Sequence, residues 1–125
     1  MLTQLLVAAL MLQSAPAPAV PVPVPMPAPA SLSQENRALL RCATAFALVA
    51  QGQAAGEPQA LQWPDLSLRG REFFVRALAQ LMDASGADRD AIAVLANAEA
   101  RALTASGEVP AIMPSCLLML EAAKL

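Results

Sequence analysis

The first 30 residues of this chain carry no charged side chain, and all 18 charged residues lie in the remaining 95. Because charged residues belong almost entirely to the surface of a folded domain, a long charge-free stretch is a poor candidate for part of one. The folding unit is therefore expected over residues 31–125, which suffices for one small hydrophobic core.

The charge-free stretch has the organisation of an export leader. Residues 5–12 form an apolar run of the length found in signal peptides, shorter than the ~20 residues needed to cross a bilayer. We expect a signal peptide over residues 1–19, although a second small-x-small cleavage motif ends at residue 30. The mature protein is then expected to be periplasmic or secreted, with no stable membrane span.

Proline dominates the second half of the leader. Residues 16–30 contain seven of the chain's eleven prolines, nearly all at alternate positions. This pattern favours an extended polyproline II spacer over a folded segment. We expect a Pro-rich disordered spacer over residues 20–30, with a docking ligand for an aromatic groove as the alternative.

The remaining chain is helical in composition, because Ala and Leu dominate and only eight Val, Ile or Thr occur. Glycines are expected to end the first three helices, and Pro110 and Pro114 to interrupt the chain before the last. The predicted fold is all-α, a small up-and-down bundle of about four helices. Apolar residues recur at helical spacing over residues 33–51, 67–84, 89–105 and 115–124.

The connection over residues 53–66 is long for a small bundle and contains Trp63, the only Trp. A connection of this length is either functional or packed on itself. We expect Trp63 to cover the edge of the core, with ligand stacking as the alternative.

Two cysteines lie on the apolar faces of the first and last predicted helices. An even number of cysteines in an exported protein favours a disulfide, here between Cys42 and Cys116. Without export, two separate buried thiols are the alternative. The spacing of Met113, Cys116 and Met119 could hold Cu(I), but methionines at helical spacing are more typical of core packing. No metal site is predicted.

Two charged residues fall on apolar helix faces. Glu99 lies in the middle of the apolar face of the third predicted helix, and Arg71 lies on the apolar flank of the second. If these helices form a tight antiparallel hairpin about Gly86, the two side chains come within reach of each other. The sequence therefore predicts a partly buried Arg71–Glu99 ion pair that fixes the register of the hairpin.

Catalytic and nucleic-acid-binding functions find little support. The chain has no His, no phosphate-binding loop and no nucleophile elbow, and its pI is about 4.9. We expect no catalytic residue, no cofactor and no nucleic-acid partner. The excess of Arg over Lys indicates a bacterial source.

Apolar residues exceed what so small a core requires, which favours a binding surface. We expect a non-enzymatic protein that binds another protein or peptide through an apolar helix surface. One alternative is an acid-responsive periplasmic holdase, since the gross plan is similar to periplasmic acid-stress chaperones. Another is a carrier of a small molecule or metal in the bundle interior. The expected surface consists of Leu40, Leu48, Trp63, Phe73 and Leu118.

Overall fold

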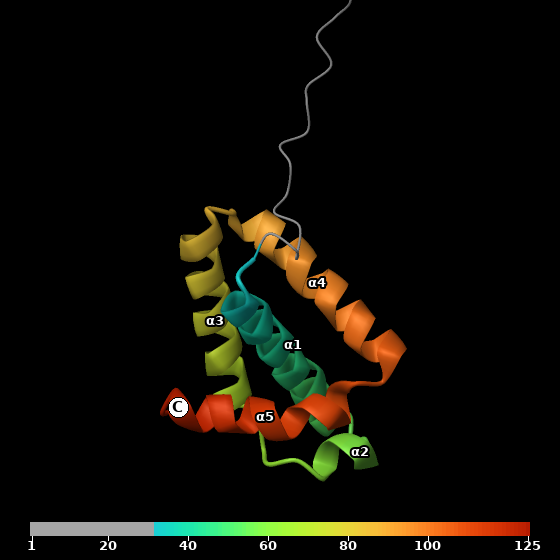
Figure 1. The fold of residues 1–125 in the computed structure, drawn as a ribbon. Helices are drawn as coiled ribbons and strands as arrows, with labels where there is room; N and C mark the ends of the chain where they lie inside the picture. Colours follow the sequence, from blue (N-terminus) through green and yellow to red (C-terminus); the bar gives the residue numbers. More distant parts are fainter. Residues whose placement is uncertain (1–31) are drawn as a thin grey trace, which may run out of the picture.

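The structure, a computed structural model, describes residues 32–125. The signal peptide expected over residues 1–19 and the spacer expected over residues 20–30 lie outside this part. Within it the chain forms helices and their connections without a strand, so the predicted all-α bundle with four long helices is confirmed (Figure 1). The helices are α1 (Gln34–Ala54), α2 (Pro58–Leu61), α3 (Arg69–Ser85), α4 (Arg89–Ser106) and α5 (Val109–Ala122).

Helix α1 is the centre of the fold and contacts each of the other four helices. Helices α3 and α4 diverge from their shared turn on either side of α1, and α5 crosses the opposite end of the bundle (Figure 1). Because α1 lies between them, α3 and α4 touch each other much less than either touches α1. They are therefore not the tight hairpin that the sequence predicts.

Most helix ends lie where the sequence predicts them. Ser33 caps α1 by accepting a hydrogen bond from the Asn36 N–H, and Asp88 caps α4 by accepting one from the Ala91 N–H. Gly86 ends α3 in the left-handed conformation with φ of 70°, which glycine adopts without steric cost.

Gly52 does not end the first helix, contrary to the prediction, because α1 continues to Ala54. Its role is close packing, since a Cβ atom at Gly52 would lie 2.8 Å from the Cβ of Ala60 in α2. Any larger residue at this position would push α2 away from α1.

The last helix begins at Val109, six residues earlier than predicted. Pro110 lies in the first turn, where a helix needs no N–H donor, so it starts the helix instead of breaking it. The Glu108 carbonyl accepts the N–H groups of Ala111 and Ile112 and closes this turn. Pro114 is tolerated inside the helix at the loss of one backbone hydrogen bond.

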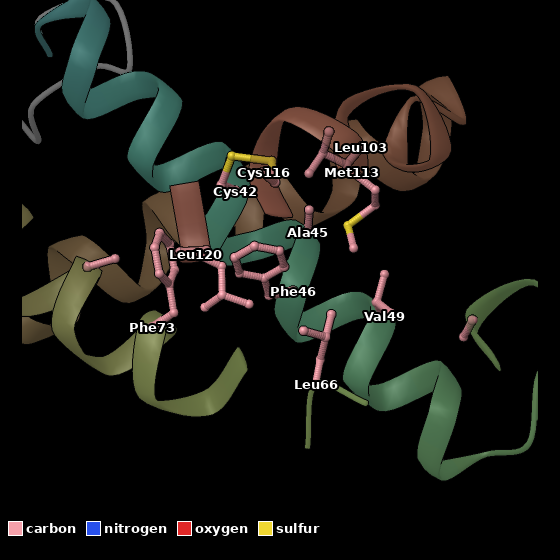
Figure 2. Packing of buried hydrophobic residues seen from close by; sticks show 13 residues of the cluster. Cys42, Ala45, Phe46, Val49, Leu66, Phe73, Leu103, Met113, Cys116 and Leu120 are labelled. Carbon is pink, nitrogen blue, oxygen red and sulfur yellow. A yellow bond between two sulfur atoms is a disulfide. The ribbon is translucent and has the colours of Figure 1, made fainter. Parts of the chain in front are cut away.

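The main hydrophobic cluster, which we call the disulfide core, is built around Phe46, whose side chain is fully buried. The Phe46 and Phe73 rings pack edge to face with their centroids 5.1 Å apart (Figure 2). Beside them, Cys42 of α1 and Cys116 of α5 form a disulfide with their Cα atoms 5.2 Å apart, which confirms the predicted pairing.

A second, smaller cluster fills the space near the α3–α4 turn, where Leu40 and Leu81 meet Ile92 and Leu95. Leu81 of α3 and Ile92 of α4 belong to the same cluster, so the two helices approach each other near their shared turn. Further along, α1 separates them.

Candidate functional site

A cleft of about 520 Å³ lies at the C-terminal end of α1, among α2, the connection that follows it, the C-terminal end of α4 and the start of α5. We call it the Trp63 cleft. Leu48 and Trp63 contribute apolar surface to its wall, and Glu57 is the only charged residue among those that line it. The remaining lining is apolar or uncharged polar. The cleft therefore disfavours an anionic ligand.

Trp63 packs at the edge of the core and also faces a cleft. The cluster it contacts is the disulfide core, the cleft is the Trp63 cleft, and its side chain is half-buried.

Gln53 holds the connection that carries Trp63, and we call its set of hydrogen bonds the Gln53 clamp. The side-chain Nε2 donates to the carbonyl oxygens of Ala60, Trp63 and Pro64 at 3.1, 3.2 and 2.8 Å. Its Oε1 accepts the Leu66 N–H at 3.0 Å. One amide thus satisfies four backbone groups of a segment that has little secondary structure of its own.

No sequence pattern singles out Gln53, because an amide side chain near the end of a helix is ordinary. The one available signal is its place two residues before a long connection, whose backbone groups need partners from elsewhere. Gly52, immediately before it, has no side chain and therefore lets α2 pack closely against α1 beside the cleft.

Asp65 orders the last part of the connection. Its Oδ1 accepts the Ser67 N–H at 2.9 Å, two residues before the start of α3. Hydrogen bonds from the Ser67 N–H, and secondarily from its hydroxyl, hold the pKa of Asp65 below its ordinary value of 3.8. The deprotonated carboxylate is therefore the form that this turn favours.

The structure divides the predicted binding surface. Leu48 and Trp63 come together in the Trp63 cleft. Leu118 is 73% exposed on α5, outside the residues that line the cleft. Leu40 and Phe73 are only 2% and 4% exposed, so the prediction that they form a surface is wrong. Phe73 of α3 belongs to the disulfide core, where its ring packs against Phe46. Leu40 belongs to the second cluster, because α1 is surrounded and buries residues outside a single helical stripe.

The predicted Arg71–Glu99 ion pair is also wrong. Arg71 is exposed, and Glu99 lies instead beside Arg41 of α1, with Arg41 Nε and Glu99 Oε1 4.0 Å apart. Arg41 also pairs with Glu108 at the α4–α5 junction. The physical reason is the position of α1 between α3 and α4, which places the cation nearest to Glu99 on α1.

Neither a metal site nor a membrane span is found in the part of the chain that the structure describes. Over residues 32–125 no three side chains of Cys, Asp or Glu gather in a metal-binding arrangement. No helix in the same range is long and apolar enough to cross a bilayer. Cys116, considered above for Cu(I), has its sulfur in the disulfide.

Comparison with known proteins yields no match: no protein-family model, no curated protein and no solved structure is similar to this chain.

Proposed function

We propose that this protein is an exported, non-enzymatic binding module that holds an extended, uncharged segment of another protein in the Trp63 cleft. The observation that carries the proposal is the half-buried Trp63 in a cleft whose lining contains one charged residue. Clefts with apolar walls and a few convergent polar groups are typical of ligand sites.

The chemistry of the lining fits a peptide backbone. Apolar side chains of a peptide could bury against Leu48 and Trp63. The side-chain amides of Gln51 and Gln59 line the same cleft and are exposed, so they can pair with backbone groups of the ligand. An extended peptide needs such partners because its backbone groups are not paired internally.

The lack of His in the chain, the residue most often used in general acid–base catalysis, supports binding over catalysis. The apolar leader run supports export. The Cys42–Cys116 pair is compatible with an oxidising compartment, and we propose the periplasm or the extracellular space.

Intrinsic fluorescence tests the proposal directly, because Trp63 is the only Trp and the chain has no Tyr. We expect short uncharged peptides to shift the Trp63 emission to the blue in titrations, and peptides with interior Asp or Glu to leave it unchanged. Isothermal calorimetry supplies the affinity without relying on the fluorophore.

Two matched variants locate the site. Leu48→Glu places a charge in the cleft and should weaken peptide binding by at least roughly tenfold, equivalent to about 1.4 kcal/mol. Leu118→Glu, on the exposed face of α5, should leave the affinity unchanged. If no uncharged peptide binds, or if only Leu118→Glu weakens binding, the proposal is wrong.

A further inference from the structure

A second cleft, which we call the Arg76 cleft, lies where α1, α3 and α5 meet. Its volume is about 290 Å³, and it shares no lining residue with the Trp63 cleft. Side chains from the start of α1, the middle of α3 and the C-terminal end of the chain line it. Figure 1 shows α3 and this end of the chain on the side of the bundle away from α2. The two clefts are therefore separate sites.

The base of the Arg76 cleft is apolar and belongs to the packed core. Phe73 is 4% exposed, and the half-buried Leu39 and Met119 pack against the disulfide core beside it. At the end of the chain, Leu125 also lines the cleft, and its carbonyl oxygen accepts a hydrogen bond from Arg69 Nε at 2.8 Å. An apolar group of a ligand would therefore bury against a surface that is already formed.

The polar residues of the lining place opposite charges on two different helices. Arg76 and Gln80 lie one turn apart on α3, and Glu35 lies in the first turn of α1. The α3 side of the cleft thus offers guanidinium and amide donors, and the α1 side offers a carboxylate. Within residues 32–125 no ion pair joins Glu35 to Arg76. Both side chains are exposed, so each can turn toward a ligand in the cleft.

This arrangement selects for a ligand that carries both charges. A carboxylate alone would pair with Arg76 but would be repelled by Glu35, and an ammonium group alone would meet the reverse problem. A zwitterion pairs with both residues through charge-assisted hydrogen bonds. The volume lies at the lower end of the range of ligand sites, roughly 300–1,000 Å³, so the ligand must be small.

We propose that the Arg76 cleft binds a free amino acid with an apolar side chain. Its carboxylate pairs with Arg76 and Gln80, its ammonium group pairs with Glu35, and its side chain buries against Phe73 and Met119. This inference goes beyond the proposed function and does not depend on it, because the two clefts have no residue in common.

Isothermal calorimetry of the full chain with L-leucine tests the inference. We expect saturable binding of one leucine per chain. Three related probes each lack one recognised group: isocaproate lacks the ammonium group, isoamylamine lacks the carboxylate, and glycine lacks the apolar side chain. Each should bind at least roughly tenfold more weakly than leucine. If leucine does not bind, or if any of the three binds as tightly, the inference is wrong.

Charge-neutralising variants assign each contact. Arg76→Gln and Glu35→Gln should each weaken leucine binding by at least roughly tenfold. In addition, Arg76→Gln should no longer distinguish leucine from isoamylamine, and Glu35→Gln should no longer distinguish leucine from isocaproate. A general disturbance of the fold would not produce these two separate losses. Arg71→Gln is the matched control, because Arg71 is exposed on the same helix as Arg76 and does not line the cleft.

The control should bind leucine like the unaltered chain, and an equal loss in Arg71→Gln and Arg76→Gln would overturn the inference. Trp63 fluorescence separates the two sites, since Trp63 lines only the Trp63 cleft. Saturation with leucine should leave the Trp63 emission unchanged. A shift of the emission would place leucine in the Trp63 cleft and would also contradict the inference, whereas failure of every peptide to bind would leave it intact.

Discussion

The disulfide core and the connection over residues 55–68 lie side by side but are held in different ways. In the disulfide core, buried side chains from several helices surround Phe46, and a covalent bond joins α1 to α5. In the connection, Leu66 is the only residue whose side chain is fully buried. The side-chain amide of Gln53 in α1 hydrogen-bonds four of its backbone groups. The core is therefore stabilised by many contacts, whereas the shape of the Trp63 cleft depends on the Gln53 clamp.

Removal of the disulfide should have the largest effect on stability and little effect on the cleft. For two cysteines 74 positions apart, the chain-entropy model gives a loss of about 4.5 kcal/mol in the free energy of unfolding for Cys42→Ala together with Cys116→Ala. Urea unfolding measures this loss. The folded variant should keep the native Trp63 emission, because the Gln53 clamp is untouched. A loss comparable to that of a surface substitution would contradict this account of the core.

Gln53→Ala should have an intermediate effect on stability and a large effect on the cleft. It leaves several backbone groups of the connection without partners and should lower the free energy of unfolding by about 2 kcal/mol. The native Trp63 emission should also shift to the red. Gln62→Ala is the matched control, since this Gln lies in the same connection and makes one exposed hydrogen bond to the Gln59 carbonyl. Its effect should stay within about 0.5 kcal/mol.

Gln53→Glu sharpens the same test. The carboxylate can still accept the Leu66 N–H. Its second oxygen, however, faces the carbonyl oxygens of Ala60, Trp63 and Pro64, to which Nε2 donates in the native protein. We expect this variant to be no more stable than Gln53→Ala at pH 7. As the pH falls and the new carboxyl is protonated, its free energy of unfolding should rise relative to that of Gln53→Ala. Equal pH profiles for the two variants would show that the donors of Gln53 do not hold the connection.

The smallest expected effect is the pH dependence that Asp65 gives to the stability of the connection. Because the pKa of Asp65 is lowered in the folded state, its stabilising contribution is fully present above the unfolded value of 3.8. The contribution is lost as the pH falls through the lower folded-state pKa. In an NMR titration the Ser67 amide resonance should move with an apparent pKa below 3.8, and Asp65→Asn should abolish this movement. A folded-state Asp65 pKa at or above 3.8 would contradict the hydrogen bond.

The sequence alone determined the class of fold and most of the helix ends, because these depend on neighbours along the chain. Helical spacing of apolar residues predicted the four long helices. The caps that the structure shows at Ser33 and Asp88 depend only on residues within the first turn of their helices. The cysteine pairing was also within reach, since two cysteines allow a single intramolecular bond. Pro110 was misread because a proline that breaks a helix interior also starts a helix well.

Only the tertiary structure decided which residues meet across helices. A helical wheel assigns one apolar face to each helix, but α1 is surrounded by four helices and buries Leu40 as well as Phe46. The same arrangement places Arg41 beside Glu99 and leaves Arg71 exposed. The Trp63 cleft likewise arises where α1, α2 and α5 converge, and the Gln53 clamp that supports it joins residues 7 to 13 positions apart. Such contacts depend on how the helices pack, and the residue pattern of a single helix does not contain that information.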